Sequence, residues 1–331
     1  MPTTCPSCQS EAFEVLDSVS SAALVGGYRQ PYLAIDISAL LPEACAVIDL
    51  LACRRCGLRW FFPMPAGDAS FYEQLQHHPW YYQTDKPEHA HAAAQIGPGQ
   101  TVLEVGCGAG AFAAHLPPLV SYKGLEFNNA AVQRALAAGL DVSKRTVEAE
   151  AEAKPARYDV VCHFQVLEHV PDLVTFMRAC VQALRPGGCL IVAVPSEDSF
   201  LRIAGSAWLN MPPHHVTRWT DAALTHLFEA LDVEVESVWH EPVAACHADW
   251  YAAVLSEHAV ARRLGLRTSL AGGGWPARLA YRTARIPRLQ RWLLAHGEAA
   301  FEFSGRGHTV CAVGRLRPGP AGSRTAAPLE Q

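Results

Sequence analysis

One ten-residue stretch, TVLEVGCGAG at residues 101–110, constrains the fold of this chain more than any other. It is an apolar run that ends in three alternating glycines, Gly106, Gly108 and Gly110. A strand that ends in a glycine-rich turn and opens a helix lets a ligand approach the backbone closely. The run also contains Glu104, and a carboxylate on a buried strand is costly unless a partner compensates it. The stretch therefore predicts a ligand site at the end of a buried strand.

Apolar strand-like runs alternate with helix-like runs over the middle of the chain. The expected strands are Val102–Gly106, Tyr122–Phe127, Tyr158–Phe164 and Cys189–Val194, and the expected helices are Ala111–Leu116, Ala130–Ala138 and Pro171–Leu184. This alternation predicts an α/β fold with a parallel sheet and helices on both faces. Two further strands are expected at 233–241 and 308–316, on either side of a segment of different composition.

The composition favours a globular chain, because half of the 331 residues are apolar and only 18% are charged. The formal net charge of −5 gives no reason to expect nucleic-acid binding. The first residues, MPTTCPSCQS, lack the basic and apolar regions of a secretory signal, and no apolar run reaches membrane-spanning length. We therefore expect a cytoplasmic protein, which the scattered cysteines in strand-like runs also favour.

Two cysteine pairs near the N-terminus have the spacing of metal ligands. CPSC supplies Cys5 and Cys8, CRRC supplies Cys53 and Cys56, and the following Gly57 allows a tight turn. Paired knuckles of this kind place four thiolates tetrahedrally around a structural zinc ion. Cys45 is an alternative ligand, and a redox role is the alternative function, although neither pair follows a strand and opens a helix as in thioredoxin-like units.

These features divide the chain into four expected regions. Residues 1–66 form a zinc-binding module, and 67–95 form an aromatic linker or lid helix that packs between the modules or covers a ligand. Residues 96–317 form the α/β domain, with an arginine-rich insertion at about 242–307, and 318–331 form a disordered tail. The aromatic residues of the linker are Tyr72, Trp80, Tyr81 and Tyr82.

Three motifs follow the glycine turn in a fixed order: the acid in YKGLEF, then YDVVCHFQVLEHV, then LRPGGCLIVAVP. With VLEVGCGAG they resemble the class I S-adenosylmethionine-dependent methyltransferases, over residues 96–240 and again in HTVCAVGRL. The resemblance implies a Rossmann-like seven-stranded sheet whose last strand is antiparallel, and S-adenosylmethionine as cofactor. The segment of different composition before the last strand is then expected to be a helical insertion. A zinc-binding, zinc-ribbon-like segment ahead of such a domain resembles bacterial sugar and natural-product methyltransferases.

The resemblance also implies roles for residues of the cofactor site. Gly106 and Gly108 would line the methionine end of the cofactor, Glu126 would hold its ribose, and Glu104 would face its amino group or orient the loop. Glu148 is the candidate for the adenine amine, although VEAEAEA also suits a flexible acidic loop. The full set of expected cofactor-binding residues is Glu104, Gly106, Cys107, Gly108, Gly110, Glu126, Phe127, Glu148, Phe164 and Gln165.

Methyl transfer from a sulfonium ion needs a nucleophile held in line with the methyl group and, for a hydroxyl, a general base. His214 and His215 in WLNMPPHHVTRWT are candidates, because histidine titrates near neutral pH. His169 in LEHV is a third candidate. The alternative for His214 and His215 is a structural role, capping or bracing the helix that follows.

The expected acceptor is an oxygen or carbon of a small or glycan-related molecule, such as a nucleotide-sugar or a lipid-linked sugar. The insertion carries eight arginines and one acid between Leu255 and His296, which suits an anionic acceptor or peripheral membrane contact, although a solvated helical cap is the default. Two other functions stay open: an NAD-dependent oxidoreductase, because Gly106, Gly108 and Ala111 also fit a dinucleotide pattern, and a non-catalytic module that binds S-adenosylmethionine.

Overall fold

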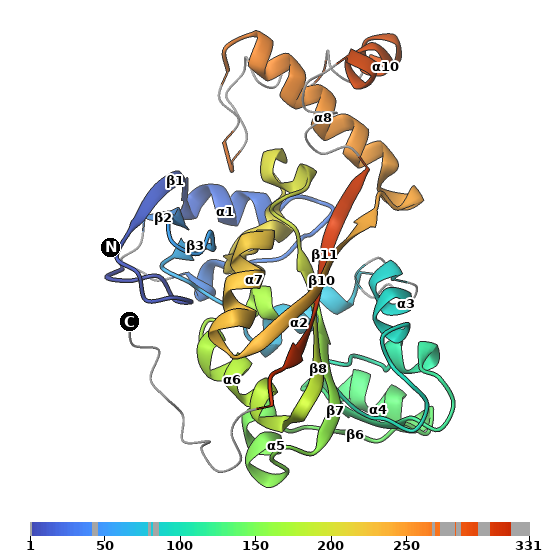
Figure 1. Ribbon diagram of the computed structural model, residues 1–331. Helices are drawn as coiled ribbons and strands as arrows, with labels where there is room; N and C mark the ends of the chain where they lie inside the picture. The colour runs from blue at the N-terminus through green and yellow to red at the C-terminus, as the bar shows by residue number, and fades with distance from the viewer. Residues whose placement is uncertain are drawn as a thin grey trace.

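The computed structural model describes residues 2–41, 46–78, 81, 86–266, 269–271, 282, 286–296 and 305–318 (Figure 1). Its larger sheet has the strand order β10-β11-β8-β7-β4-β5-β6. The strands are β4 (Thr101–Val105), β5 (Ser121–Leu125), β6 (Val142–Ser143), β7 (Tyr158–Phe164), β8 (Leu184–Pro195), β10 (Val233–Pro242) and β11 (Arg306–Leu316). The strand β11 is antiparallel to both of its neighbours, whereas β4 to β8 pair in parallel. The predicted α/β fold with an antiparallel last strand is confirmed.

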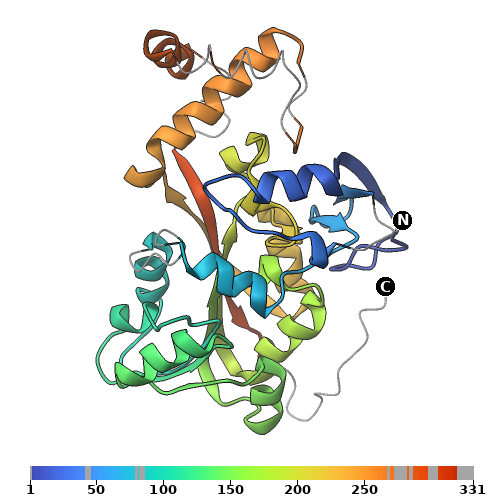
Figure 2. The same cartoon turned by 180° about the vertical axis from the view of Figure 1, so that it is seen from behind.

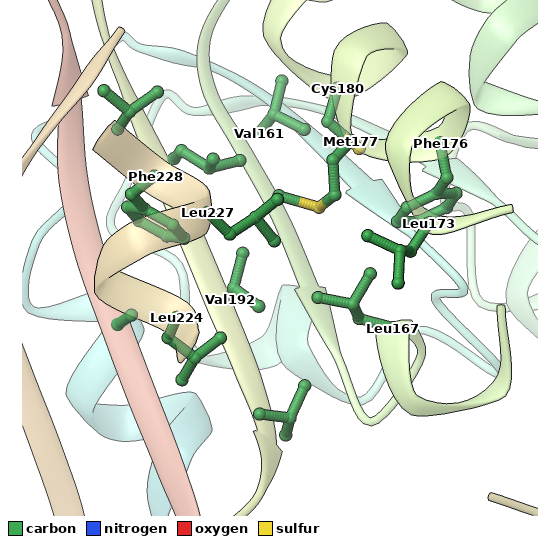
Figure 3. Close-up of a cluster of buried hydrophobic side chains, with 14 of the residues drawn as sticks. Val161, Leu167, Leu173, Phe176, Met177, Cys180, Val192, Leu224, Leu227 and Phe228 are labelled. Atoms are coloured by element: carbon green, nitrogen blue, oxygen red, sulfur yellow. The ribbon is translucent and has the colours of Figure 1, made fainter. Parts of the chain in front are cut away.

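Helices cover both faces of this sheet, as the alternation predicted. On one face α5 (Val147–Ala153), α6 (Leu173–Ala183) and α7 (Asp221–Ala230) pack on the strands, and Figure 3 shows Met177 and Leu227 meeting over Val161 and Val192. The opposite face packs against α3 (Pro87–Ala93) and a 3₁₀ helix at Phe112–His115, while α4 (Asn129–Ala137) packs near β6. Because side chains alternate along a strand, Val161 faces the first layer and Val160 the second.

In three segments the structure differs from the secondary structure expected from the sequence. The helix expected at Ala111–Leu116 is only the 3₁₀ helix Phe112–His115, since two prolines follow it in HLPPL. The acidic segment that suited a flexible loop is helix α5, whose N-cap Thr146 accepts a hydrogen bond from the Ala149 N–H. The single helix expected in the aromatic region is two helices, α2 (Ala69–Gln76) and α3, and Pro87 begins the second at a position that favours proline.

The N-terminal region forms a second, antiparallel sheet in the order β1-β2-β3-β9. Its strands are β1 (Phe13–Ser20), β2 (Val47–Cys53), β3 (Arg59–Phe62) and β9 (Thr217–Arg218), with α1 (Ser21–Tyr28) after β1. The strand β9 belongs to the segment between β8 and α7, so one strand of the larger domain completes the N-terminal sheet. The two sheets therefore share a segment that, as described below, also carries the candidate histidines.

A buried ionic cluster reinforces this junction. Glu197, which follows β8, is 1% exposed and pairs with Arg59 at 2.7 Å and with Arg218 at 3.4 Å. The guanidinium of Arg218 also donates to the Asn210 carbonyl and lies 5.1 Å from the Phe61 ring centroid. A buried charge is tolerated when it is paired and hydrogen-bonded in this way.

The expected helical insertion is represented by α8 (Ala248–Arg263) and α10 (Pro287–His296), which extend away from the sheets (Figures 1 and 2). The guanidinium of Arg263 on α8 lies 4.8 Å from the Trp292 ring centroid on α10. Among the described residues, no helix is long and apolar enough to cross a membrane. Much of the arginine-rich segment, including Arg278 and Arg285, and residues 319–331 of the tail lie outside the described residues.

Candidate functional site

A cavity of about 1910 Å³ opens at the carboxyl ends of the parallel strands. In open α/β sheets, ligands bind outside these ends, where the strand order reverses, and here it reverses between β4 and β7. Pockets for a single small ligand usually have volumes of about 300–1,000 Å³. The cavity is therefore large enough for a cofactor and an acceptor together.

The glycine turn after β4 forms one wall of this cavity. Gly106 and Gly108 line it with φ values of 71° and 54°, in the left-handed region that glycine adopts without strain. A Cβ atom at Gly106 would lie 2.5 Å from a Val166 methyl carbon, so a larger residue would also clash. The backbone N–H groups of Gly106 and Cys107 both donate to the Leu125 carbonyl, at 2.8 and 3.0 Å. These contacts bring the ends of β4 and β5 together.

Gly110, which was expected to contact the cofactor, has a different place. It is not among the residues that line the cavity, and a Cβ atom there would overlap the Leu140 side chain. Its φ of 84° again requires the left-handed region. The structure therefore gives Gly110 a packing role behind the turn, between β4 and the chain that leads into β6.

Acidic residues expected around the cofactor also line the cavity. The Glu126 carboxylate, just after β5, accepts hydrogen bonds from the N–H groups of Gly108 at 2.9 Å and Asn128 at 2.7 Å. Glu148 on α5 lines the same cavity. Phe127, which follows Glu126, also lines it and is 63% exposed. The turn thus holds the Glu126 carboxylate beside the glycines, where two hydroxyls of a ribose could reach it.

Glu104, the unexpected acid on β4, is 3% exposed and lines the cavity. The Tyr122 hydroxyl on β5 donates to its carboxylate at 2.5 Å. Burial raises the pKa of Glu104 to about 8, although the Tyr122 hydrogen bond and the charge of Lys86 lower it in part. A cation bound in the cavity would stabilise the ionised form, so Glu104 is suited to face a positively charged group.

Phe164 and Gln165 follow at the end of β7 and also line the cavity. The Gln165 side-chain amide donates to Glu88 on α3 and to Thr309 on β11, at 3.3 Å each. The Phe164 ring packs edge-on against His89 of α3, with 4.9 Å between centroids. These contacts connect the end of β7 with α3 and with β11.

The three candidate histidines meet in one buried cluster on the cavity wall. His169 ends the 3₁₀ helix Leu167–His169, and His214 and His215 come from the segment before β9. Their possible ligand atoms lie within 4.8 Å of one another. Helix α7, which they were expected to cap if their role was structural, is capped by Thr220 instead.

Each of these imidazoles has its Nδ1 atom against an oxygen. The partners are the His214 carbonyl for His169 at 2.5 Å, the Leu209 carbonyl for His214 at 2.8 Å, and Asn210 Oδ1 for His215 at 3.0 Å. Because these oxygens can only accept, each neutral ring carries its proton on Nδ1 and keeps a lone pair on Nε2. The His214 Nε2 lies 3.3 Å from the Tyr81 hydroxyl.

Burial sets the protonation states in this cluster. It lowers the pKa of His169 to about 4 and that of His215 well below its usual value, and the neighbouring His214 lowers the latter further. Glu168 is 1% exposed, and burial raises its pKa to about 8. Its Oε1 lies 3.8 Å from His169 Nε2 and 3.9 Å from His215 Nε2. The imidazoles are therefore neutral at neutral pH, with a carboxyl group beside them.

In the N-terminal region, four cysteines come together in one cluster: Cys5, Cys8, Cys53 and Cys56. The Sγ atoms of Cys5 and Cys56 are 3.8 Å apart, and those of Cys8 and Cys53 are 3.5 Å apart. A tetrahedral site with zinc–sulfur bonds of about 2.3 Å has sulfur–sulfur edges of about 3.8 Å. The thiols thus fit a zinc ion, whereas Cys45 lies outside the described residues.

The second cysteine knuckle also contacts the larger domain. Gly57 has a φ of 80°, as the tight turn requires, and its carbonyl accepts a hydrogen bond from the Thr220 hydroxyl at 3.2 Å. Thr220 is the N-cap of α7, so the knuckle rests on the start of that helix.

Comparisons with known proteins agree with this arrangement. A family model described as a methyltransferase domain matches residues 79–238. A ubiquinone biosynthesis O-methyltransferase of Nitrosospira multiformis is 32% identical over 162 residues, which cover 43% of this chain and 68% of that protein. The chain belongs to the class I S-adenosylmethionine-dependent methyltransferase family. A probable S-adenosylmethionine-dependent methyltransferase of Mycolicibacterium smegmatis is 37% identical over 144 residues, 42% of this chain and 53% of that one.

The matches have limited extent. The chain spans about half the length of the first curated relatives that it matches, 46% and 53%. A solved S-adenosylmethionine-dependent methyltransferase from Archaeoglobus fulgidus aligns with a TM-score of 0.46 and 15% identity, over 75% of this chain and all of that one.

The sheet topology argues against the alternative of an NAD-dependent oxidoreductase. The dinucleotide-binding fold of such enzymes has a parallel strand next to its fifth strand. In this chain the strand at that position, β11, is antiparallel to β8.

Several residues of the site escaped the sequence analysis. Tyr122, Glu168 and Lys86 line or support the cavity, but an isolated tyrosine, acid or lysine gives no spacing signal. Glu168 does stand next to the candidate base His169 in the LEHV motif, and this position is the one sequence signal that points to it. A further group brings His308 beside Glu241 and His247, which lie far earlier in the sequence.

The raised pKa of Glu104 predicts a pH dependence of stability. A carboxyl group whose folded pKa is about 8 instead of 4.5 binds its proton more tightly in the folded state, so its ionisation destabilises the fold as pH rises. Between these values, the free energy of unfolding of the ligand-free protein should fall relative to Glu104→Gln, by up to about 1.4 kcal/mol per pH unit. Denaturant titrations of both proteins from pH 4.5 to pH 8 measure this difference, and parallel curves would contradict the assignment.

Proposed function

We propose that this chain transfers the methyl group of S-adenosylmethionine to a hydroxyl oxygen of a small-molecule acceptor. The observation that carries this proposal is that one cavity is lined by both the glycine turn with Glu126 and the His169–His214–His215 cluster. Family membership supports the cofactor, and the cavity volume supports simultaneous binding of an acceptor. Both requirements of methyl transfer, an electrophile and a deprotonated nucleophile, can then be met in one cavity.

The residues present fit the cofactor. Glu126 would accept hydrogen bonds from the ribose hydroxyls, and the left-handed turn at Gly106 and Gly108 would let the methionine end approach the backbone. Glu104, held by Tyr122, would become ionised when the cationic cofactor enters. When bound, the cofactor supplies an electrophilic methyl group on its sulfonium.

His215 is the proposed general base. Its Nδ1–H is directed at Asn210, so the Nε2 lone pair is available to accept the proton of an acceptor hydroxyl. The low pKa keeps it unprotonated, and the Glu168 carboxyl group, which burial keeps protonated near neutral pH, lies 3.9 Å from its Nε2. His169 and His214 fix the position of the cluster, since the His169 ring contacts the His214 carbonyl.

Oxygen is proposed over carbon as the acceptor atom, because matched relatives carry the name ubiquinone biosynthesis O-methyltransferase. The acceptor is either a phenolic ring or a sugar, and the aromatic side chains of Tyr72, Tyr81 and Trp208 on the cavity wall suit both. A panel that contains catechols and nucleotide-sugars separates these two classes.

Methyl transfer from radiolabelled cofactor to this panel tests the function. We expect one acceptor class to be labelled by the wild-type chain, and His215→Asn to lower kcat by about 10²–10⁴-fold, the usual contribution of a general base. The affinity for S-adenosylhomocysteine should stay unchanged in that variant. His226→Asn, at a partly buried position on α7 outside the cavity lining, serves as the matched control.

Two results would contradict this proposal in different ways. Cofactor binding without labelling of any acceptor would favour a non-catalytic module that binds S-adenosylmethionine. Full activity of His215→Asn would remove this residue as the base while leaving the methyltransferase function intact.

We also propose that Cys5, Cys8, Cys53 and Cys56 hold a structural zinc ion. All four ligands would be protein atoms, which leaves no open position for a substrate. The ion would hold the knuckles beside α7, where Gly57 meets Thr220.

Metal analysis and thermal unfolding test this zinc proposal. Purified protein should contain one zinc ion at this site, and Cys56→Ser should lower both the zinc content and the melting temperature, because metal binding is coupled to folding. Cys246→Ser removes an exposed thiol outside the cluster and should change neither. Equal zinc content in both variants would exclude the four-cysteine site.

A further inference from the structure

A second group of metal-type ligands lies on the cavity wall at the base of the helical insertion. Glu241 is near the end of β10, His308 is near the start of β11, and His247 ends the 3₁₀ helix Ala245–His247 that precedes α8. All three residues line the cavity, and one possible ligand atom from each lies within 4.8 Å of the others. The register of the antiparallel pair β10–β11 brings the first two together.

Glu241 is a buried carboxylate without a permanent cation beside it. It is 1% exposed, and its Oε1 accepts the His308 backbone N–H at 2.8 Å. Within the described residues, its ion-pair contact is with the His308 imidazole, and neither lysine nor arginine pairs with it. Glu197, equally buried, is compensated by two arginines. A buried charge needs compensation, and a bound cation would add to the partial compensation that His308 gives Glu241.

Each of the two imidazoles has a nitrogen atom close to this carboxylate. The His308 Nδ1 lies only 2.6 Å from Glu241 Oε1, yet the described structure gives no aligned hydrogen bond for this atom or for His247 Nδ1. The two rings meet edge-on, with 4.6 Å between centroids. Close but misaligned donor atoms are expected when side chains converge on a common point instead of on each other.

The backbone also makes room for the carboxylate. A Cβ atom at Gly307 would lie 2.6 Å from Glu241 Oε1 and 2.8 Å from its Cδ, so only glycine allows Glu241 this position. The glycine immediately precedes His308, whose backbone N–H donates to the same carboxylate.

We propose that Glu241, His247 and His308 bind a divalent transition-metal ion of the zinc and cobalt class. Two imidazoles and one carboxylate are a known donor set for such ions, and three protein ligands leave coordination positions open. Because the ligands line the cavity, these positions would be accessible to water or to an acceptor oxygen. The ion would also tie both ends of the segment between β10 and β11 to the sheet.

The His169–His214–His215 cluster is a weaker candidate for the same ion. The His214 Nε2 already contacts the Tyr81 hydroxyl, and each Nδ1 in the cluster has an oxygen partner. Glu168 stands 3.8 Å or more from the ring nitrogens, and its raised pKa keeps it protonated near neutral pH. That cluster therefore offers no carboxylate as closely placed as Glu241.

Cobalt titration of the full chain tests the proposal. Protein first saturated with one equivalent of Zn²⁺, to fill the cysteine site, is titrated with Co²⁺ and followed by visible absorption. We expect one further Co²⁺ per chain, with d–d bands and without the thiolate-to-cobalt charge transfer that a cysteine site produces. Glu241→Gln should weaken this binding by at least about tenfold, since changes even to outer-shell partners of metal sites cost about 10–100-fold.

The controls make each outcome decisive. His247→Asn repeats the test with a residue that makes fewer contacts, in case Glu241→Gln unfolds, and should also weaken binding. Glu236→Gln changes an exposed acid on the same strand, paired with Arg315, and should leave binding intact. Absence of non-thiolate cobalt binding in the wild type would overturn the proposal. Binding that survives Glu241→Gln and His247→Asn but is lost in His215→Asn would overturn it too, since the ion would then sit in the other cluster.

Discussion

The hydrogen bonds from the Gly106 and Cys107 N–H groups to the Leu125 carbonyl hold the end of β4 against the end of β5. The left-handed turn that makes these bonds also exposes the Gly108 N–H to the Glu126 carboxylate. Without this turn, the chain would form neither this wall of the cavity nor the hydrogen bond that positions Glu126. The turn is possible because β4 is a central, parallel strand whose neighbours on both sides end at the same edge of the sheet.

The N-terminal region supports the side of this cavity that carries the histidine cluster. The Tyr28 hydroxyl of α1 donates to the carbonyls of Trp208 and Met211, at 2.9 and 3.0 Å, just before the His214–His215 pair. The strand β9, two residues after that pair, completes the N-terminal sheet. The zinc-type knuckle rests on α7 at Thr220. The histidine segment is therefore held from both sides, which explains how buried imidazoles keep fixed orientations.

Local signals in the sequence were enough for much of the fold. Buried parallel strands such as β7 and β8 are continuous apolar runs, which the sequence shows directly. The spacing of the paired cysteines is enough to predict the four-thiol cluster. Long-range contacts were not accessible. Nothing near Glu104 in the sequence indicates that Tyr122 is its partner, and nothing near Gly110 indicates that Leu140 packs on it. The Glu241–His247–His308 group depends on strand register and on the return of the chain after the insertion, which spacing does not encode.

Calorimetric titration with S-adenosylhomocysteine, run beside NADH, is the most direct test of the cofactor site. We expect binding of S-adenosylhomocysteine alone, weakened at least about tenfold by Glu126→Ala because a charged hydrogen-bond partner of the ribose is lost. Glu152→Ala, an exposed acid on α5 outside the cavity lining, should bind like the wild type. A preference for NADH, or no effect of Glu126→Ala, would contradict the cofactor site described at the end of β4 and β5.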